Sequence, residues 1–205
     1  MTFQQELSSW FYPRNTPIPS PIPHPGDRAP TTPLLNLQPN KPTLLTFLRH
    51  CGCPWAEKTY LAFRSTATSN PGIDFIAISH SSQTSTDKWL ASLPPLANNA
   101  SEPKNLRVIV DDGMEIYAAY GLGQASFLHV LDPRALWNVY QTGKREGIWN
   151  RPTESGSRWV ISGSYGVDAE GVVRWGGPMG RADEIPEFGD AVEKVSGSGK
   201  VEAKL

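Results

Sequence analysis

Short apolar runs alternate with helix-type segments along most of this chain. The runs at 43–48, 73–79 and 106–110 have the length and continuous hydrophobicity of buried β-strands. Helical patterns are expected between and after them, and a polar, loop-like stretch follows at 143–157. The helices are expected from 54 to about 66, near 87–90, at 115–120, at 132–140 and at 185–195, and a β-hairpin is expected from 159–167 and 172–175.

This order of elements predicts an α/β fold. Strand and helix alternate first, which favours parallel strands joined by right-handed crossovers, and the antiparallel hairpin comes last. We therefore expect one mixed central sheet with helices on both faces, formed by residues 43–195. At 205 residues the chain is long enough for one well-buried domain with extensions.

The two ends of the chain have a different character. Residues 2–12 have apolar side chains at helical spacing, and ten prolines between 13 and 42 predict an extended segment. We expect residues 1–42 to be an N-terminal extension that wraps over the domain; a flexible linker or a ligand for a proline-reading partner is the alternative. Residues 196–205 are expected to be a flexible tail.

Composition excludes several classes of partner. The formal net charge is -1 and 19% of the residues are charged, so no global field favours nucleic acid or an anionic membrane. No run is long enough to cross a bilayer and the N-terminus lacks a secretory pattern, so we expect an intracellular, cytoplasmic protein. The last three residues, Ala203 to Leu205, approximate a peroxisomal address, although an ordinary frayed tail explains them equally well.

The only two cysteines lie where the first strand gives way to a helix. Cys51 and Cys53 flank one glycine, and Pro54 follows at the position where a first helical turn tolerates proline. A cysteine at a helix start faces unpaired N–H groups and the positive end of the helix dipole, which favours thiolate over thiol. Cys53 is therefore the candidate nucleophile for a peroxide oxygen or a disulfide sulfur, with Cys51 as its resolving thiol. The competing explanation is two small buried residues that fill the junction.

Two basic residues precede the cysteines. Arg49 and His50 are candidates for stabilising the thiolate or moving a proton. Because consecutive side chains on a strand point to opposite faces, at most one of them faces Cys53. A structural role for His50 is an equal alternative.

Three stretches carry a resemblance to a known family. They are Phe47 to Lys58, Val110 to Gly123 and Tyr165 to Val173. The chain resembles the thioredoxin-like superfamily and, within it, peroxiredoxin-like proteins of the alkyl hydroperoxide reductase/thiol-specific antioxidant (AhpC/TSA) type. The resemblance implies a thioredoxin-like fold, with Cys53 as the nucleophile that a peroxide converts to a sulfenic acid.

The chain departs from the family pattern at three positions. Ala56 stands where a C-x-x-C pair has its second cysteine, and His50 stands where peroxiredoxins carry Thr or Ser. Gly163 lies near the position of the family's cis-proline. The resemblance also implies that Trp55 forms a rim for substrates or partners, for which core packing is the alternative.

These observations give four candidate substrate-binding residues and three functional hypotheses. The residues are Trp55, Gly163, Arg158 and Trp149; a solvated surface arginine is the competing role for Arg158. The first hypothesis is a thiol-dependent oxidoreductase acting on a peroxide or disulfide at the expense of a cellular thiol reductant. The second is non-redox chemistry on a small metabolite, such as isomerisation or cyclisation, and the third is a redox-responsive binding protein.

The remaining patterns predict no further site. The four histidines have no metal-ligand spacing, and Gly121-Leu122-Gly123 lacks the third glycine of a dinucleotide loop. We therefore expect no metal and no cofactor. The sequence leaves open whether the protein forms a homodimer.

Overall fold

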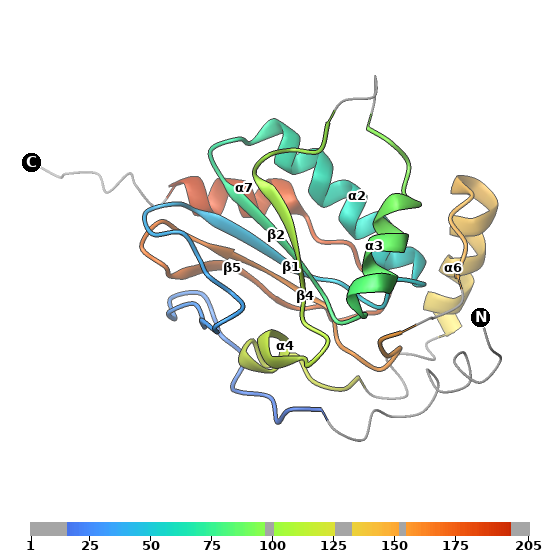
Figure 1. Ribbon diagram of the computed structural model, residues 1–205, viewed down its shortest axis with the longest axis horizontal. Coiled ribbons are helices and arrows are strands. Elements are labelled where there is room, and N and C mark those ends of the chain that lie inside the picture. Colours follow the sequence, from blue (N-terminus) through green and yellow to red (C-terminus); the bar gives the residue numbers. More distant parts are fainter. Residues whose placement is uncertain (1–15, 97–100, 126–132, 152–154, 198–205) are drawn as a thin grey trace, which may run out of the picture.

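The computed structural model describes residues 16–96, 101–125, 133–151 and 155–197 (Figure 1). The elements in chain order are β1 (Thr43–Phe47), α2 (Pro54–Ser69), β2 (Asp74–Ser79), α3 (Gln83–Ala91), β3 (Leu106–Val110), α4 (Glu115–Ala119), α6 (Pro133–Glu146), β4 (Gly163–Val167), β5 (Val173–Pro178) and α7 (Phe188–Ser196).

The five strands form one mixed sheet in the order β3-β2-β1-β4-β5. β1, β2 and β3 run parallel, whereas β4 is antiparallel to β1 and β5 is antiparallel to β4. The predicted α/β plan with a mixed sheet is therefore confirmed. β1 is the central strand, so the segment that follows it, with both cysteines, lies at the carboxyl end of the middle of the sheet.

Two apolar clusters lie on opposite faces of the sheet. On one face α2 and α7 pack on the sheet, where the ring of Phe63 contacts those of Phe75 and Phe188. On the other face α4 packs through Tyr117, which meets Phe47 edge to face. Figure 1 shows α2 and α7 above the sheet and α4 below it. Burial of these large side chains stabilises the sheet from both sides.

The described part of the N-terminal extension follows the α4 face. The backbone N–H of Ser20 donates to the carbonyl of Ala118 at 2.8 Å, and that of Gly26 donates to Val173 at 2.8 Å. Leu35 is buried in the same apolar cluster as α4. The division of the chain at residue 42 stays a prediction.

Several boundaries differ from the sequence prediction: α3 begins earlier than expected, at Gln83, β5 extends to Pro178 and α7 begins at Phe188. Two further differences have a cause in the structure. The expected loop 143–157 is wrong at its start, because α6 continues to Glu146. Gly143 does not end the helix: a Cβ there would lie 2.4 Å from the ring of Trp149, so glycine gives the indole room to pack. The first hairpin strand starts at Gly163 and not at 159, because Val160 forms a bridge with Gln124 instead.

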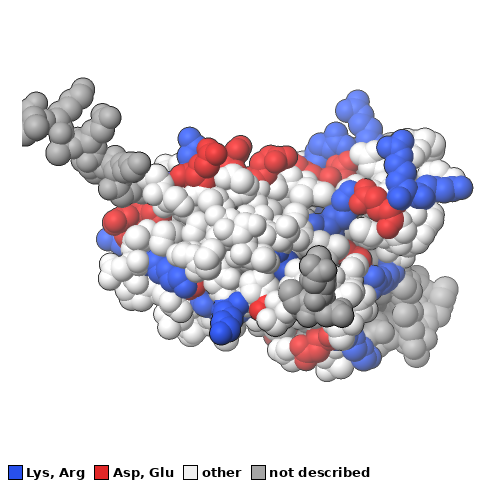
Figure 2. All heavy atoms as spheres, turned by 90° about the horizontal axis from the view of Figure 1, so that it is seen from above, with Lys and Arg blue, Asp and Glu red and all other residues white. Residues whose placement is uncertain are grey.

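The predicted helix at 2–12 and the C-terminal signal at 203–205 lie outside the described residues. Within the described ranges no helix is long and apolar enough to cross a membrane. Figure 2 shows Lys and Arg side chains gathered at the end of the molecule that carries α6, with Asp and Glu residues interspersed.

Candidate functional site

Three strand ends and three helix starts meet at one edge of the sheet. β1, β2 and β3 are parallel, so their carboxyl ends lie side by side, and α2, α3 and α4 begin shortly after them. Helix starts direct unpaired N–H groups and positive partial charge toward the same region. In open α/β sheets this edge is where ligands bind.

Cys53 is the N-cap residue of α2. It has extended backbone angles, with φ -83° and ψ 127°, and Pro54 follows at the first helical position, as predicted. Its N–H donates to the carbonyl of His50 at 2.9 Å, which closes a tight turn around Cys51 and Gly52. The side chain makes no capping hydrogen bond and is 7% exposed, within the apolar cluster that includes Leu48.

Cys51 lies in more polar surroundings. It is half-buried, and its N–H donates to Ser81 Oγ at 3.2 Å. Its Sγ lies 3.7 Å from Ser79 Oγ and 3.8 Å from Thr86 Oγ1, and these two hydroxyls are 2.9 Å apart. Both cysteines are free thiols. The sequence places the two thiols together, but the structure gives them different neighbours.

His50 is buried against the cysteine turn. Its Nδ1 accepts a hydrogen bond from the N–H of Gly52 at 3.1 Å. Burial, and after it the charges of Arg158 and Arg49, hold the pKa of His50 well below its usual range. The ring is therefore neutral near pH 7 and can act as an acceptor that orders the turn.

Arg49 is a buried arginine whose guanidinium makes few hydrogen bonds within the described part of the chain. It is 8% exposed, and its Nη2 donates to the carbonyl of Arg158 at 3.2 Å. Its Nε and Nη1 are buried and have no hydrogen-bond partner among the residues that the structure describes. The alternative role of Arg158 as a solvated surface arginine is wrong, because that residue is only 6% exposed. Arg49 and Arg158 are joined across 109 residues of sequence.

His80 is a site residue that the sequence did not indicate. It follows β2 directly, is buried, and its Nε2 lies 3.1 Å from the carbonyl oxygen of Ser157. Its Nδ1 lies 3.3 Å from Tyr117 Oη. Burial lowers the pKa of His80 to about 4, although the hydrogen bond to the Ser157 carbonyl opposes this shift. A single histidine after an apolar run gives no sequence signal of this environment.

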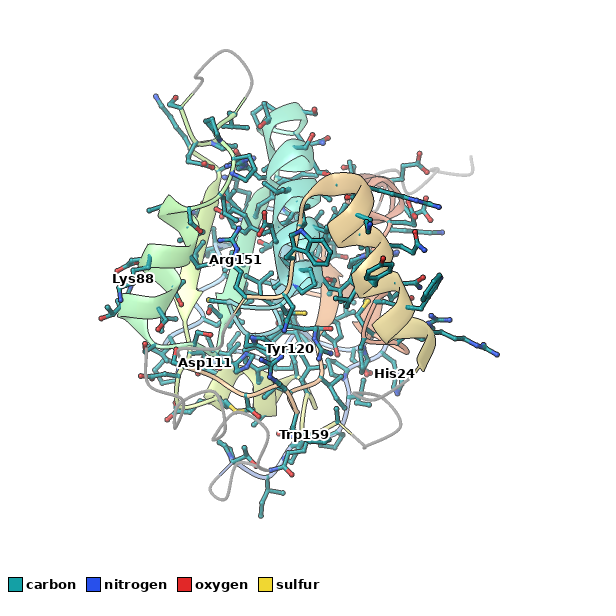
Figure 3. The ribbon with its side chains drawn as sticks, turned by 90° about the vertical axis from the view of Figure 1, so that its right-hand side faces the viewer. His24, Lys88, Asp111, Tyr120, Arg151 and Trp159 are labelled. Atoms are coloured by element: carbon teal, nitrogen blue, oxygen red, sulfur yellow. The ribbon has the colours of Figure 1, made fainter. Side chains whose placement is uncertain are left out.

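Arg151 was also missed, although it fixes the cysteine turn. Its N–H donates to the carbonyl of Gly52 at 2.8 Å, and its guanidinium bonds to the buried Glu57 at 2.8 Å and to Ser92. Figure 3 shows Arg151 between α3 and α2. One side chain therefore ties the segment after α6 to both helices.

Asp111 organises the third helix start. Its carboxylate accepts the N–H groups of Glu115, Ile116 and Tyr117 at 2.8 to 3.1 Å, and Figure 3 shows it beside α4. Burial raises its pKa, and the three N–H donors oppose that rise. The acceptors are spent on capping the helix, so the role of Asp111 is structural.

The predicted substrate residues fall into two groups. Trp55 and Gly163 line one small cavity together with Arg49. Trp149 does not line this cavity. It is 48% exposed, and the centroid of its ring lies 6.4 Å from that of Tyr140 in α6. Arg158 joins the first group through its carbonyl bond to Arg49. Among the described residues no three His, Cys, Asp or Glu side chains are placed to hold a metal ion.

Comparison with known proteins shows the fold. The chain is similar to a peroxiredoxin-like protein from Aquifex aeolicus, with a TM-score of 0.56 and 16% identity over 87% of this chain and 89% of that one. It is similar to a thiol peroxidase from Chromobacterium violaceum, with a TM-score of 0.56 and 18% identity over 90% and 92%. A variant of peroxiredoxin 6 from Arenicola marina gives 0.53 and 10% identity over 78% of this chain and 62% of that one.

No protein-family model matches the sequence, and no curated protein does either. The structural likeness shows that the chain has the thioredoxin-like fold of peroxiredoxin-like structures.

Proposed function

We propose that this protein is a thiol-dependent oxidoreductase in which Cys53 attacks a peroxide or a disulfide and Cys51 resolves the product. The observation that carries the proposal is the position of Cys53 at the N-cap of α2, on a thioredoxin-like fold and two residues from a second free thiol. The structural likeness to a thiol peroxidase supports it.

The reaction with a peroxide needs two steps at these residues. The Cys53 thiolate attacks one peroxide oxygen, the O–O bond breaks, and the leaving oxygen takes a proton to give water or an alcohol. The Cys51 thiol then attacks the sulfenic sulfur, forms the disulfide and releases water. A cellular thiol reductant donates two electrons and two protons to restore both thiols.

The site residues have separate roles in this scheme. The helix start at Cys53 and the buried Arg49 supply positive potential for the thiolate, while the neutral His50 holds the turn through Gly52. Trp55 and Gly163 border the small cavity that Arg49 also lines. Because Cys53 is only 7% exposed, reaction requires the turn at residues 50–53 to open toward solvent.

The test is direct detection of the first intermediate. The reduced protein is treated with dilute hydrogen peroxide and a dimedone-type probe, and the adduct is located by mass spectrometry. We expect the adduct on Cys53, with a higher yield in Cys51→Ser, where no resolving thiol remains. If neither cysteine carries an adduct while a control peroxiredoxin labels fully, the redox proposal fails.

A non-redox function is favoured by one observation, the apolar surroundings of Cys53. In that case the fold acts on a small metabolite without thiol chemistry. A Cys51→Ser, Cys53→Ser protein that keeps full activity on such a substrate would establish it.

A further inference from the structure

The segment between α6 and β4 crosses the sheet edge at which both cysteines lie. On one face Arg151 bonds to Glu57 of α2, and on the other Val160 belongs to the apolar cluster that includes residues of α4. Figure 3 shows Arg151 on the side of α2 and α3 and Trp159 on the side of α4. We call residues 155–158 of this segment the clamp. They form neither helix nor strand, so contacts with other elements must hold them.

Two side chains that follow β2 hold the backbone of the clamp. The Ser81 hydroxyl donates to the carbonyl of Ser155 at 3.2 Å. His80 Nε2 lies 3.1 Å from the carbonyl oxygen of Ser157, which can only accept, so the imidazole donates here. Both side chains are buried, and a buried hydrogen bond is costly to leave unmade. The clamp is therefore fixed to the end of β2 at two points.

Gly156 allows the clamp to approach the end of β2 this closely. Its φ is +80°, in the left-handed region that favours glycine. A Cβ at this position would lie 2.9 Å from Ser81 Oγ and 3.2 Å from the ring of His80. A side chain at residue 156 would therefore push the clamp away from the two residues that hold it.

The Ser81 hydroxyl also links the clamp to the cysteine turn. It accepts a hydrogen bond from the N–H of Cys51 at 3.2 Å while it donates to the carbonyl of Ser155. One hydroxyl therefore joins the backbone of the turn to the backbone of the clamp. If either of them moves, the same side chain loses a hydrogen bond.

Two further hydrogen bonds hold the residues around the turn. Before the turn, Arg49 Nη2 donates to the carbonyl of Arg158 in the clamp at 3.2 Å. Within the turn, the carbonyl of Gly52 accepts a hydrogen bond from the N–H of Arg151 at 2.8 Å. The turn and the residue before it are thus bonded at three positions to the clamp or to Arg151. Because these bonds end on one segment of the chain, we expect them to break together when the clamp moves.

We infer that the clamp controls access to Cys53: it holds the turn at residues 50–53 closed, and its release exposes the sulfur. Cys53 is only 7% exposed in the closed turn. Local opening of a few hydrogen-bonded residues needs less free energy than global unfolding, so it sets how often a buried thiol meets a reagent. Control of substrate access in this way rests on the proposed function, whereas the opening itself can be measured without any redox reaction.

The test measures alkylation of Cys53 in the full chain with Cys51→Ser, so that one thiol remains. The folded protein is treated with iodoacetamide, and the rate is followed by mass spectrometry. In Gly156→Ala we expect alkylation to be faster by about tenfold or more, because backbone strain and the contacts of the Cβ favour release of the clamp. Gly171→Ala is the matched control: its φ is +78°, but its Cβ would lie 3.4 Å from Arg28 Nη1, the far end of a flexible side chain. It should leave the alkylation rate unchanged.

A second variant removes the link between clamp and turn without straining a glycine. Ser81→Ala deletes the hydroxyl that joins the two backbones and should also speed alkylation of Cys53. Ser69→Ala is its control, because the Ser69 hydroxyl donates to the carbonyl of Ser65 within α2, and it should leave the rate unchanged. If Gly156→Ala does not fold, Ser81→Ala decides the question.

Hydrogen exchange separates release of the clamp from a general loss of stability. Ile76 lies in β2 and pairs with strands on both sides, so its amide should exchange faster in both glycine variants, since both strain the folded state. The amides of residue 51 and Arg151 are bonded in the closed turn. They should exchange faster only in Gly156→Ala, because release of the clamp relieves the strain at residue 156 and not at residue 171.

Two results would overturn the inference. Equal alkylation rates in Gly156→Ala and Gly171→Ala would mean that Cys53 reacts through unfolding of the domain. A rate that Gly156→Ala and Ser81→Ala both leave unchanged would mean that the turn opens without the clamp. The redox function is tested separately. If Cys53 gives no peroxide adduct but is alkylated faster in Gly156→Ala, the proposed function fails and the clamp stands, whereas an adduct with equal alkylation rates means the reverse.

Discussion

The surroundings of the two cysteines differ sharply, although one glycine separates them in sequence. Cys53 lies in the apolar cluster under α2 and is 7% exposed, and its side chain makes no capping hydrogen bond to α2. Cys51 is more exposed and lies beside the hydroxyls of Ser79 and Thr86. The first thiol has the helix start and the second has polar neighbours.

Position at a helix start and access to solvent are therefore separate requirements for a reactive thiol. The helix start favours a thiolate at Cys53, while burial limits contact with substrate. At Cys51 the hydroxyls are weak partners for sulfur, and access is easier. A division of roles between an attacking and a resolving thiol follows from this contrast.

The strongest test of that division is the exchange of each cysteine for serine. In Cys53→Ser we expect peroxide turnover with dithiothreitol as reductant to fall at least about a thousandfold, because the nucleophile is lost. Cys51→Ser should still consume one peroxide per protein in a single turnover, followed by stopped-flow fluorescence. The opposite pattern would assign the attack to Cys51.

The next largest effect is expected from pH on the stability of the folded protein. It acts through His80, which is buried directly after β2. Its pKa is lowered to about 4, chiefly by burial, from 6.5 in the unfolded chain. The stability that neutral His80 contributes is therefore fully present above pH 6.5. It falls as the pH drops toward 4, because only the unfolded chain takes up the proton on this histidine. The loss should reach about 3 kcal/mol across this window.

Urea unfolding at several pH values between 7 and 4 measures this loss. The pKa of the buried His50 is also lowered, so it acts in the same direction. Asp111 has the opposite effect on stability. Because its pKa is raised in the folded protein, the folded state takes up this proton first as the pH falls, which stabilises it just above the usual pKa of an aspartate. The variant His24→Asn, at an exposed position, serves as the control and should show the same pH slope as the unmodified protein. A flat stability profile would contradict the buried neutral state of His80.

Loosening the segment between the two cysteines should have a smaller effect. Arg151→Ala removes the partner of the buried Glu57 carboxylate, which should cost about 2 kcal/mol of unfolding free energy. It should also speed alkylation of both cysteines by iodoacetamide, because the guanidinium no longer anchors residues 147–151 over Gly52. Lys58→Ala breaks the more exposed pair with Glu146 and should cost less than about 1 kcal/mol. Equal alkylation rates in the two variants would show that Arg151 does not hold the cysteine turn in place.

The smallest effect is expected on the polar side of Cys51. Thr86→Val keeps the shape of the side chain and leaves Ser79 Oγ with one partner fewer, which should cost about 1 kcal/mol. The rate of disulfide formation after peroxide treatment should change with it. Thr68→Val is the control, because that hydroxyl donates to the carbonyl of Arg64 within its own helix. An unchanged disulfide rate would show that the hydroxyls do not assist Cys51.

Most of the elements could be predicted because their signals are local. The apolar runs of β1, β2 and β3 and the Cys53-Pro54 helix start are read from residues close in sequence. The errors at 143 and 159 arise where a local signal is overridden by packing against another segment. Gly143 indicates a helix end but provides room for Trp149, and the residues at 159–162 are apolar like a strand but pair with 123–125.

The candidate site could be predicted only in part. Residues 49–55 follow one another, so their order is enough to bring two thiols, two basic side chains and a tryptophan to one strand-to-helix junction. Contacts between distant segments bring Arg158 to Arg49, bury His80 in its neutral form and join Arg151 to Glu57. These pairs join segments up to 109 residues apart, and hydrophobic periodicity carries no information on which loops meet. The fold therefore follows from local pattern, whereas burial and charge at the thiols follow from contacts between distant loops.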